Sequence, residues 1–444
     1  MMKLFQSNVL WQRLFLIGCT IGAIAHGYVI SFGRSDKIRD FDLHRSFGKA
    51  FLEGDNLYWI GYLYPYMPIG AMYFSPLALV ERNLGLFLRY SVAVCTLVIS
   101  LVLLKRMVES RYHIKASKGL IPGVITVVLI LQFLLYDLDD GGPQLILTGM
   151  LVAGIYFVWK GSQKIGALWF GLAIALKVSP ALFVPFFMWK RMWRLACYTI
   201  IAALIWILLP VVWMGSSNWW TYQKIWIETA VGSAVGINTA ITLDNVERVR
   251  NQALRPALMR YLMTYPEDHP IRKDDPAYTP LLDLSPGIAH SIGIVAVMAL
   301  ITLFCWHTRH PYRGPLDPEW LKECSGVMII TLLISPMAWI QHLPWLLPGV
   351  YLIIAAIVMK KHIDPTTLVV LSGYVLLTVI LNYEVIGKRN FQVLLSYHPF
   401  TIAMLLILGI LLFSPSLARV SEYKPGIPLK AEGWEKSPEM GIEG

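Results

Sequence analysis

Residues 165–189 read IGALWFGLAIALKVSPALFVPFFMW, and this stretch decides the class of fold. It is almost wholly apolar, but Lys177 and Pro180 interrupt it, and Lys164 and Lys190 flank it. Lysines that border apolar segments mark the cytoplasmic side of a membrane, so both flanks are expected on one side. Proline removes a backbone donor, and a broken backbone is tolerated in a membrane where it lines a cavity. The stretch therefore predicts two half-helices that form a re-entrant hairpin.

The rest of the chain has the same apolar character. Of its 444 residues, 56% are hydrophobic and only 15% are charged, whereas soluble proteins carry about 25% charged residues. One bilayer crossing needs roughly 20 mostly apolar residues, which leaves room for about 10 to 12 crossings. The composition excludes disordered, coiled-coil and secreted disulfide-rich chains. We therefore expect an all-α polytopic integral membrane protein with about 10–12 transmembrane helices, including the hairpin.

Ten further apolar runs predict simple crossings. They are residues 11–32, 84–104, 120–136, 144–159, 195–214, 286–306, 323–340, 343–359, 366–382 and 399–419. Basic clusters between them mark one side as cytoplasmic and place both termini there. This topology accounts for most of the net charge of +10, so no nucleic-acid partner is expected. Residues 66–80, with two prolines, predict either a second broken pair or a helix at the surface.

Polar residues concentrate on the non-cytoplasmic side, where the two large loops are 33–65 and 215–285. The second contains 15 of the chain's 66 charged residues, and a loop of this length is usually functional. We therefore expect chemistry at the outer face, within one transmembrane domain over residues 1–419. Residues 420–444, rich in Lys, Glu, Gly and Pro, predict a disordered cytoplasmic tail.

The first outer loop contains Asp40 and Asp42 at the start of an amphipathic pattern that predicts a helix lying flat on the membrane. A carboxylate at a membrane interface can serve as a general base, because partial burial raises its pKa. The alternative is a helix cap, which stabilises a helix by about 0.5–2 kcal/mol.

Lys177 and His342 are candidate ligands for an anion. An ammonium group inside an apolar hairpin costs about 2.5–3.5 kcal/mol, and a phosphate would compensate it. The alternative for Lys177 is a side chain that extends its ammonium group toward the interface. His342 lies in SPMAWIQHLPW, residues 335–345, where it could orient a phosphate or a hydroxyl, or be structural.

Two further clusters of charged residues are expected at the outer face. Asp137, Asp139 and Asp140 share a Gly-terminated turn that either binds a cation or is a solvated loop. Four arginines, Arg248, Arg250, Arg255 and Arg260, alternate with apolar residues. They predict either a cradle for an anionic head group or an amphipathic helix on anionic lipid.

Taken in order along the chain, these motifs resemble the polyprenol-phosphate-dependent glycosyltransferases of family 87, members of the GT-C superfamily. The resemblance spans most of residues 11–345. The matching positions are Asp40 and Phe41 with Gly54, Leu57 and Tyr58; Tyr64 and Pro65 with Pro68, Pro76 and Leu77; Gly142 with Gln144; Gly171 with Lys177, Pro180 and the segment from Trp189 to Arg194; Asn251, Gln252, Ala253 and Leu254 with Arg260; and Ser335 and Pro336 with Trp339 and His342.

The resemblance implies transfer of a hexose, typically mannose, from a polyprenyl-phosphate sugar to a hydroxyl of a lipid-linked glycan or glycolipid, with inversion. Asp40 would be the general base, with Asp42 as the alternative. The residues it implies for the departing phosphate are Lys177, Arg260, His342 and Arg255. Those it implies for substrate contacts are His44, Tyr58, Tyr64, Gln144, Asn251, Gln252 and Trp339.

We expect an enzyme of the cell (inner) membrane. Because the sequence shows no evident set of metal ligands, we expect it to work without a metal, with Asp139 and Asp140 as the alternative for a divalent cation. Three positions depart from the family pattern: His44 replaces a common Tyr, Ala253 replaces Ser, and Pro143 separates Gly142 from Gln144. The rival function is a transporter or flippase for lipid-linked sugars. A transporter is expected to place its ionisable residues near the bilayer midplane, whereas most of them here fall in outer loops.

Overall fold

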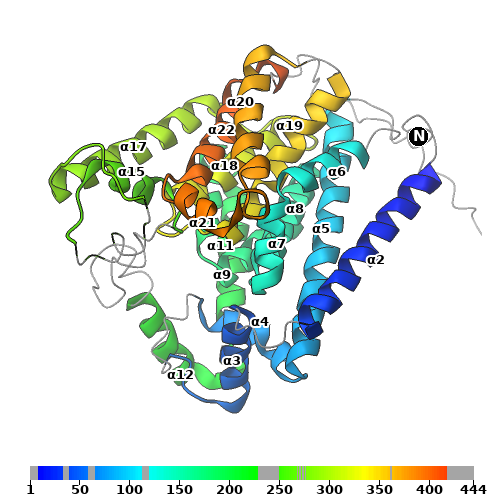
Figure 1. Cartoon of the computed structure of the whole chain (residues 1–444). Coiled ribbons are helices and arrows are strands. Elements are labelled where there is room, and N and C mark those ends of the chain that lie inside the picture. Colours follow the sequence, from blue (N-terminus) through cyan, green and yellow to red (C-terminus); the bar gives the residue numbers. More distant parts are fainter. Residues whose placement is uncertain are drawn as a thin grey trace, which may run out of the picture.

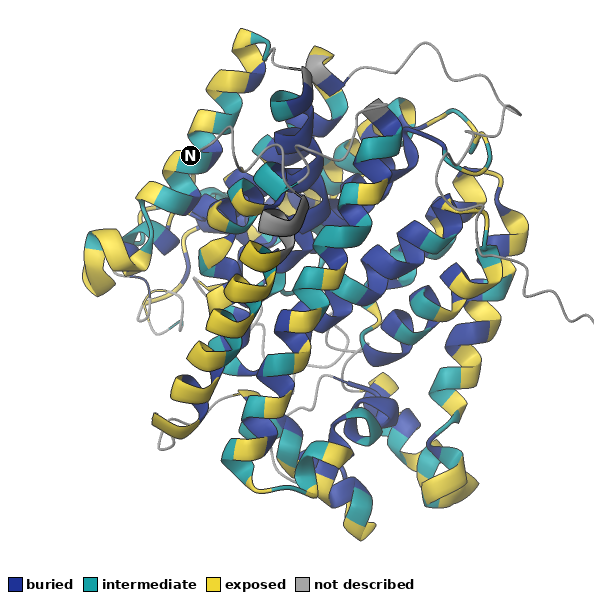
Figure 2. Ribbon diagram, turned by 90° about the vertical axis from the view of Figure 1, so that its right-hand side faces the viewer, coloured by how far each residue is buried: buried dark blue, intermediate teal, exposed yellow. Residues whose placement is uncertain are grey.

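The computed structural model describes residues 9–33, 40–58, 66–112, 120–228 and 250–417, apart from 268, 270–271, 273–274, 276 and 361–362. Every regular element in these ranges is a helix (Figure 1), which confirms the expected all-α fold. The expected tail, 420–444, lies outside the described residues. Buried residues fill the centre of the bundle and exposed ones its perimeter (Figure 2).

Four helical segments of the described chain are long and apolar enough to cross a membrane. They are Leu14–Gly33 of α2 (Val9–Gly33), Arg82–Arg111 of α5 (Arg82–Tyr112), α17 (Pro286–His307), and Ile340–Met359, which joins η4 (Ile340–Leu346) to α19 (Leu347–Lys360). Large apolar side chains on α17, such as Val295, are exposed, as expected of a surface that faces lipid. The chain is therefore a polytopic membrane protein.

Three bent pairs of helices raise the number of possible crossings to seven. They are α6 (Leu120–Leu129) with α7 (Leu131–Asp140), bent by 67°; α11 (Trp193–Leu208) with α12 (Val211–Trp226), bent by 93°; and α20 (Pro365–Val375) and η5 (Leu376–Ile380) with α21 (Tyr383–Leu395), bent by 94°. Shorter apolar helices include α8 (Gln144–Trp159) and α22 (Pro399–Phe413). The larger count of 10–12 helices stays a prediction.

Two expected crossings end earlier than the apolar runs suggest. The run 195–214 is cut at Leu208, because Pro210 follows and the chain turns into α12. The run 323–340 becomes α18 (Trp320–Ile334), which ends before Ser335 and Pro336 because a residue before proline disfavours helical geometry. The chain continues from the first break into α12 and from the second break into η4.

The hairpin at 165–189 is confirmed. Its arms are α9 (Gln163–Leu176) and η2 (Ser179–Leu182) with α10 (Phe183–Trp189), and Lys177 between them is extended, at φ −148° and ψ 122°. The arms pack together, since the Phe170 and Phe183 ring centroids are 4.8 Å apart. Both ends return to one place, where the 312–316 segment donates backbone hydrogen bonds to the carbonyls of Trp159 and Lys190.

The first outer loop contains α3 (Asp40–Glu53), and the 66–80 segment contains one helix, α4 (Pro68–Ala78). The alternative of a second broken pair at 66–80 is therefore wrong. The apolar face of α3 packs against α4 rather than on the membrane, and a side chain at Gly48 would meet the Phe74 backbone at 2.8 Å. In Figure 1, α3, α4 and α12 lie together at one end of the molecule.

Candidate active site

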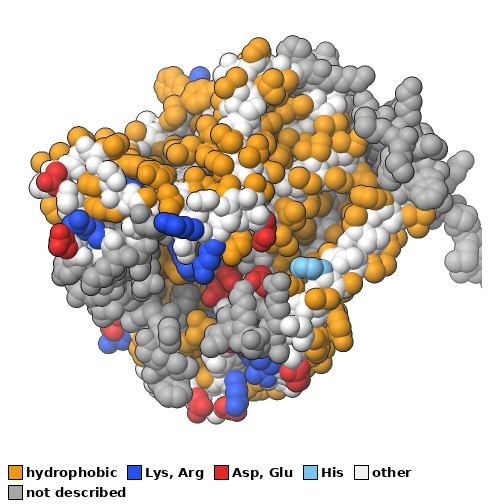
Figure 3. Space-filling model, viewed as in Figure 1, with side chains coloured by type: hydrophobic (Ala, Val, Ile, Leu, Met, Phe, Trp, Pro, Cys, Tyr) orange, Lys and Arg blue, Asp and Glu red, His pale blue; other side chains and the backbone are white. Residues whose placement is uncertain are grey.

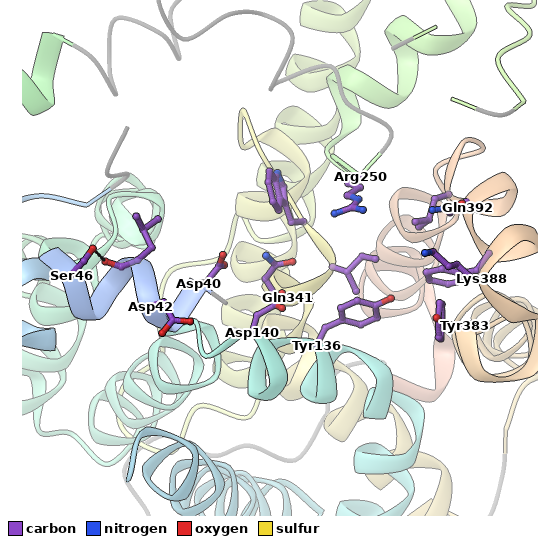
Figure 4. Close-up of a pocket in the computed structure, with 15 residues that line it drawn as sticks. Asp40, Asp42, Ser46, Tyr136, Asp140, Arg250, Gln341, Tyr383, Lys388 and Gln392 are labelled. Atoms are coloured by element: carbon purple, nitrogen blue, oxygen red, sulfur yellow. Dashed lines mark hydrogen bonds between the residues drawn. The ribbon is translucent and has the colours of Figure 1, made fainter. Parts of the chain in front are cut away.

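A cavity of about 690 Å³ lies where the N-terminus of α3, the C-terminus of α7, the 339–341 segment and α21 meet (Figure 4). This size is ordinary for a small-molecule site. One part of its lining is acidic, with Asp40, Asp42 and Asp140, and another is basic, with Arg250 and Lys388. Figure 3 shows acidic and basic side chains meeting at a hollow in this face of the molecule.

Asp40 is the first residue of α3 and faces the cavity beside Gln341. Its side chain is exposed to the cavity, but the surrounding walls withdraw it from bulk water, and this burial raises the pKa of the carboxyl. A hydrogen bond with Gln341 and the positive charges of Arg89 and Lys177 lower the pKa in part. The result is a carboxylate of raised basicity at the cavity wall.

Asp42 lines the same cavity but has a different environment. Arg82 donates to both of its carboxylate oxygens at 2.6 Å, from Nε and Nη2. This bidentate ion pair joins the first turn of α3 to the start of α5 and engages both oxygens that a base would need.

Lys177 and His342 are brought together although 165 residues separate them. The Lys177 Nζ lies 3.2 Å from His342 Nε2, and His342 Nδ1 accepts a hydrogen bond from the Trp339 backbone at 3.3 Å. The extended backbone at Lys177, directly after α9, directs its side chain toward His342. Neither side chain is part of the cavity lining, but Lys177 is close enough to act on the Asp40 charge.

The aspartates of the 137–140 turn divide into separate roles. Asp137 is fully buried, pairs with Arg89 at 2.9 Å, and accepts hydrogen bonds from the backbones of Gln144 and Leu145 at 3.1 Å. It therefore caps α8, and Gln144 is buried as the first residue of that helix. Asp140 lines the cavity. Within the described ranges, no three His, Cys, Asp or Glu side chains are grouped to hold a metal ion.

The arginines of the 215–285 segment also differ in their environments. Arg260, in α15 (Leu254–Leu262), is fully buried; its guanidinium donates to the carbonyls of Ser396, Thr279 and Ala277. It also lies 3.6 Å from Asp275 and about 5 Å from three tyrosine rings. Arg255 is half-buried beside α17. Neither lines the cavity, whereas Arg250 does, and Arg248 lies outside the described residues.

Asn251 and Gln252 act as a buried brace next to the cavity. The Asn251 amide donates to the Pro336 carbonyl at 2.7 Å and accepts from the Ala338 backbone at 2.8 Å. Gln252 bonds to Ala338 through its backbone and to the 395–400 turn through its side chain. These bonds hold the 336–338 segment, and with it Trp339 and Gln341 at the cavity wall.

The remaining residues that were expected to contact the substrate lie in different surroundings. Trp339 lines the cavity. His44 is buried, with its ring stacked 4.4 Å from Phe74, and burial lowers its pKa to about 3. The Tyr58 hydroxyl donates to the Tyr66 carbonyl at 3.1 Å. Tyr64 lies outside the described residues.

Several cavity residues were not predicted from the sequence, among them Gln341, Tyr383, Lys388 and Gln392. Gln341 directly precedes His342 in the 335–345 motif, so its place in the sequence could have predicted that it lies near the site. The 383–395 segment carried no motif, and only its location between two expected crossings on the outer side pointed to it.

The fold and the cavity define a polytopic membrane protein with a polar site at one end of its helical bundle. A family model described as glycosyltransferase family 87 matches residues 62–336, and the chain belongs to this family. The expected enzyme class, a membrane glycosyltransferase, is thereby confirmed.

Two characterised proteins are similar to the chain over most of its length. One is from Mycolicibacterium smegmatis, 23% identical over 372 residues, covering 77% of this chain and 74% of the relative. The other is from Mycobacterium tuberculosis, 23% identical over 397 residues, covering 83% and 82%. Both are named polyprenol-phosphate-mannose-dependent α-(1-2)-phosphatidylinositol mannoside mannosyltransferases. No solved structure matches the chain.

Proposed function

We propose that the protein transfers a mannosyl residue from a polyprenyl-phosphate mannose to a hydroxyl of a lipid-anchored mannoside, with inversion at the anomeric carbon. The observation that carries the proposal is Asp40, a carboxylate of raised basicity at the wall of a ligand-sized cavity in a chain of glycosyltransferase family 87. The names of both relatives support the donor and the class of acceptor.

In the proposed reaction, the Asp40 carboxylate takes the proton of the acceptor hydroxyl. The acceptor oxygen then forms a bond to the anomeric carbon as the bond from that carbon to the phosphate oxygen breaks. The electron pair of the broken bond passes to the polyprenyl phosphate. A general base works best when its pKa lies near the operating pH, so the raised pKa of Asp40 favours this role. Asp42 suits it less because Arg82 engages both of its oxygens.

Lys177, with His342 beside it, is the proposed site for the departing phosphate. An ammonium group in an apolar hairpin needs an anion to offset its desolvation, and Lys177 has no ion pair with any carboxylate of the described chain. Its charge would stabilise the negative charge that accumulates on the phosphate in the transition state. The proposal leaves out Arg260, because its guanidinium is already bonded to three carbonyls.

We place the reaction at the non-cytoplasmic face of the cell membrane. All the segments that line the cavity, at 40–46, 136–140, 250, 339–341 and 383–395, belong to parts of the chain that the lysine and arginine pattern assigns to that side. The proposed mechanism uses no metal, and Asp139 and Asp140 are not given a cation. Activity should therefore survive treatment with a chelator, and restoration by a divalent ion after a loss would contradict this.

The decisive experiment compares Asp40→Asn with Asp42→Asn in full-length protein reconstituted in lipid nanodiscs. With polyprenyl-phosphate mannose and phosphatidylinositol mannoside as substrates, loss of the base should lower kcat by about 10²–10⁴-fold. Asp42→Asn should keep most of the turnover. Wild-type turnover by a folded Asp40→Asn protein would refute the assignment of the base, and no transfer by the wild type would refute the reaction itself.

A further inference from the structure

The basic part of the cavity lining is not explained by the reaction described above. Arg250 and Lys388 come from chain segments 138 residues apart, and both are exposed to the cavity across from Asp40 (Figure 4). Among the described residues, neither has an ion pair or a hydrogen bond. The nearest acid on the same helix is Glu384, in the first turn of α21. Two cations are thus held at a ligand-sized site without a fixed counter-charge.

The local structure of α21 sets this arrangement. Gly387 breaks the helical path with φ 76° and ψ 165°, a conformation that favours glycine, so the main part of the helix starts at Lys388. Gln392 is four residues further on and therefore shares the face of Lys388, and both line the cavity. Arg389, the next residue along, is exposed but does not line it. The helix thus presents one of two neighbouring cations to the site.

We propose that Arg250 and Lys388 bind an anionic group of the acceptor, a phosphodiester of its lipid head group, while the acceptor hydroxyl reaches Asp40. This inference rests on the proposed function and adds a specificity site to it. Guanidinium and ammonium groups are the usual protein ligands of phosphate, and the Gln392 amide adds a donor on the same helix face.

The charge pattern orients the acceptor in the cavity. The carboxylates Asp40 and Asp140 repel an anion from their end of the cavity, while Arg250 and Lys388 attract it to the other end. The acceptor is therefore held with its hydroxyl at the acidic end and its phosphate at the basic end. The donor phosphate is assigned to Lys177 and His342, which do not line this cavity. The two phosphates thus have separate cations, and the basic pair selects which hydroxyl is presented to the base.

The test uses full-length protein in nanodiscs of neutral lipid, with Arg250→Gln/Lys388→Gln as the variant and Arg389→Gln as the matched control. Two acceptors are compared: phosphatidylinositol mannoside, which has the phosphodiester, and an alkyl mannoside, which lacks it. Loss of the cations should raise KM for the first acceptor about tenfold to a hundredfold. KM for the alkyl mannoside and for polyprenyl-phosphate mannose should not change. The charge-keeping variant Lys388→Arg should stay close to wild type, which separates loss of charge from loss of fold.

Direct binding of phosphatidylinositol mannoside, measured without donor, separates this inference from the proposed reaction. Binding that weakens in the double variant but not in Arg389→Gln supports the site even if no transfer is seen. Binding and KM that are the same in all variants would overturn it. A rise of KM for the donor instead would reassign the pair to the donor phosphate and overturn it as well.

Discussion

Lys177 and Arg260 are both basic residues that the sequence pattern assigned to a phosphate, yet their surroundings differ. The Arg260 guanidinium is enclosed by three backbone carbonyls, the Asp275 carboxylate and three tyrosine rings. Lys177 sits at a break between two helical arms beside one histidine nitrogen. In the first case the protein itself satisfies the charge. In the second no carboxylate of the described chain pairs with the charge, which the proposed function assigns to the donor phosphate.

The same contrast separates Asp137 and Asp42 from Asp40. Asp137 and Asp42 are each paired with an arginine, whereas Asp40, which lines the cavity as Asp42 does, has an amide partner. A buried polar group is costly unless it is bonded, so a fully bonded one is a structural brace. The hydrogen-bond partners of an ionisable group therefore distinguish a structural role from a proposed catalytic role better than its residue type does.

Arg260→Ala tests the structural member of the comparison and should have the largest effect. It leaves three carbonyls and the buried Asp275 carboxylate without their partner, which costs about 3–5 kcal/mol of stability. Thermal unfolding in detergent measures this. Arg255→Ala, on the same helix, is the control and should unfold close to wild type. A stable Arg260→Ala protein with weakened donor binding would reverse the assignment.

Lys177→Ala tests the residue proposed to bind the donor phosphate. Removing the ammonium group should weaken binding of polyprenyl-phosphate mannose about tenfold to a hundredfold, because one charge-assisted interaction with phosphate is lost. The melting temperature should stay near that of the wild type. Lys164→Ala, at the other end of the hairpin, is the matched control. Unchanged donor affinity would return Lys177 to the alternative of a side chain directed to the interface.

The pH profile tests Asp40 through its neighbour Gln341. Since the base must be ionised, kcat/KM should rise with pH through the Asp40 pKa, which burial holds above its ordinary value. Below that pKa the rate should fall about tenfold per pH unit. The Gln341 hydrogen bond lowers this pKa, so Gln341→Leu should move the acidic limb to higher pH. An acidic limb that does not move would argue against this contact.

His44 gives the smallest expected effect. Its pKa is about 3 in the folded protein against an ordinary value of 6.5, so the folded state keeps it neutral while the unfolded chain takes up a proton. The contribution of neutral His44 to the free energy of unfolding is fully present above pH 6.5 and is lost as the pH falls toward 3. Between pH 7.5 and 5 the loss should be about 2 kcal/mol. His44→Phe, which keeps the stacking on Phe74, should remove this part of the pH dependence of unfolding.

Much of the fold could be predicted because helices in a membrane must satisfy their own backbone hydrogen bonds. The re-entrant hairpin and α8 follow from apolar length, proline and flanking lysines, and both have their expected bounds within two residues. The α3 helix was predicted, but its apolar face was assigned to lipid. Only packing shows that α4 covers it, because periodicity gives the face of a helix and not its partner.

The candidate site could be predicted only in part. The sequence singled out Asp40, Lys177 and His342 through residue types that are costly in or near a membrane, and through the order of motifs. It did not separate Arg250 from Arg260, which fall in one arginine-rich segment but have opposite environments. It did not find Lys388 either, because a lysine in an outer loop looks like any solvated lysine until its neighbours are known.

The sequence by itself determined that this is a polytopic helical membrane protein with a re-entrant hairpin and polar loops between its helices, since those properties depend on local composition and spacing. Only the tertiary structure decided which charges are satisfied by the chain and which face the cavity. Asp42 meets Arg82, Lys177 meets His342, and Arg260 meets Ser396 across 40, 165 and 136 residues. Contacts over such separations come from packing of distant helices, which no local pattern encodes.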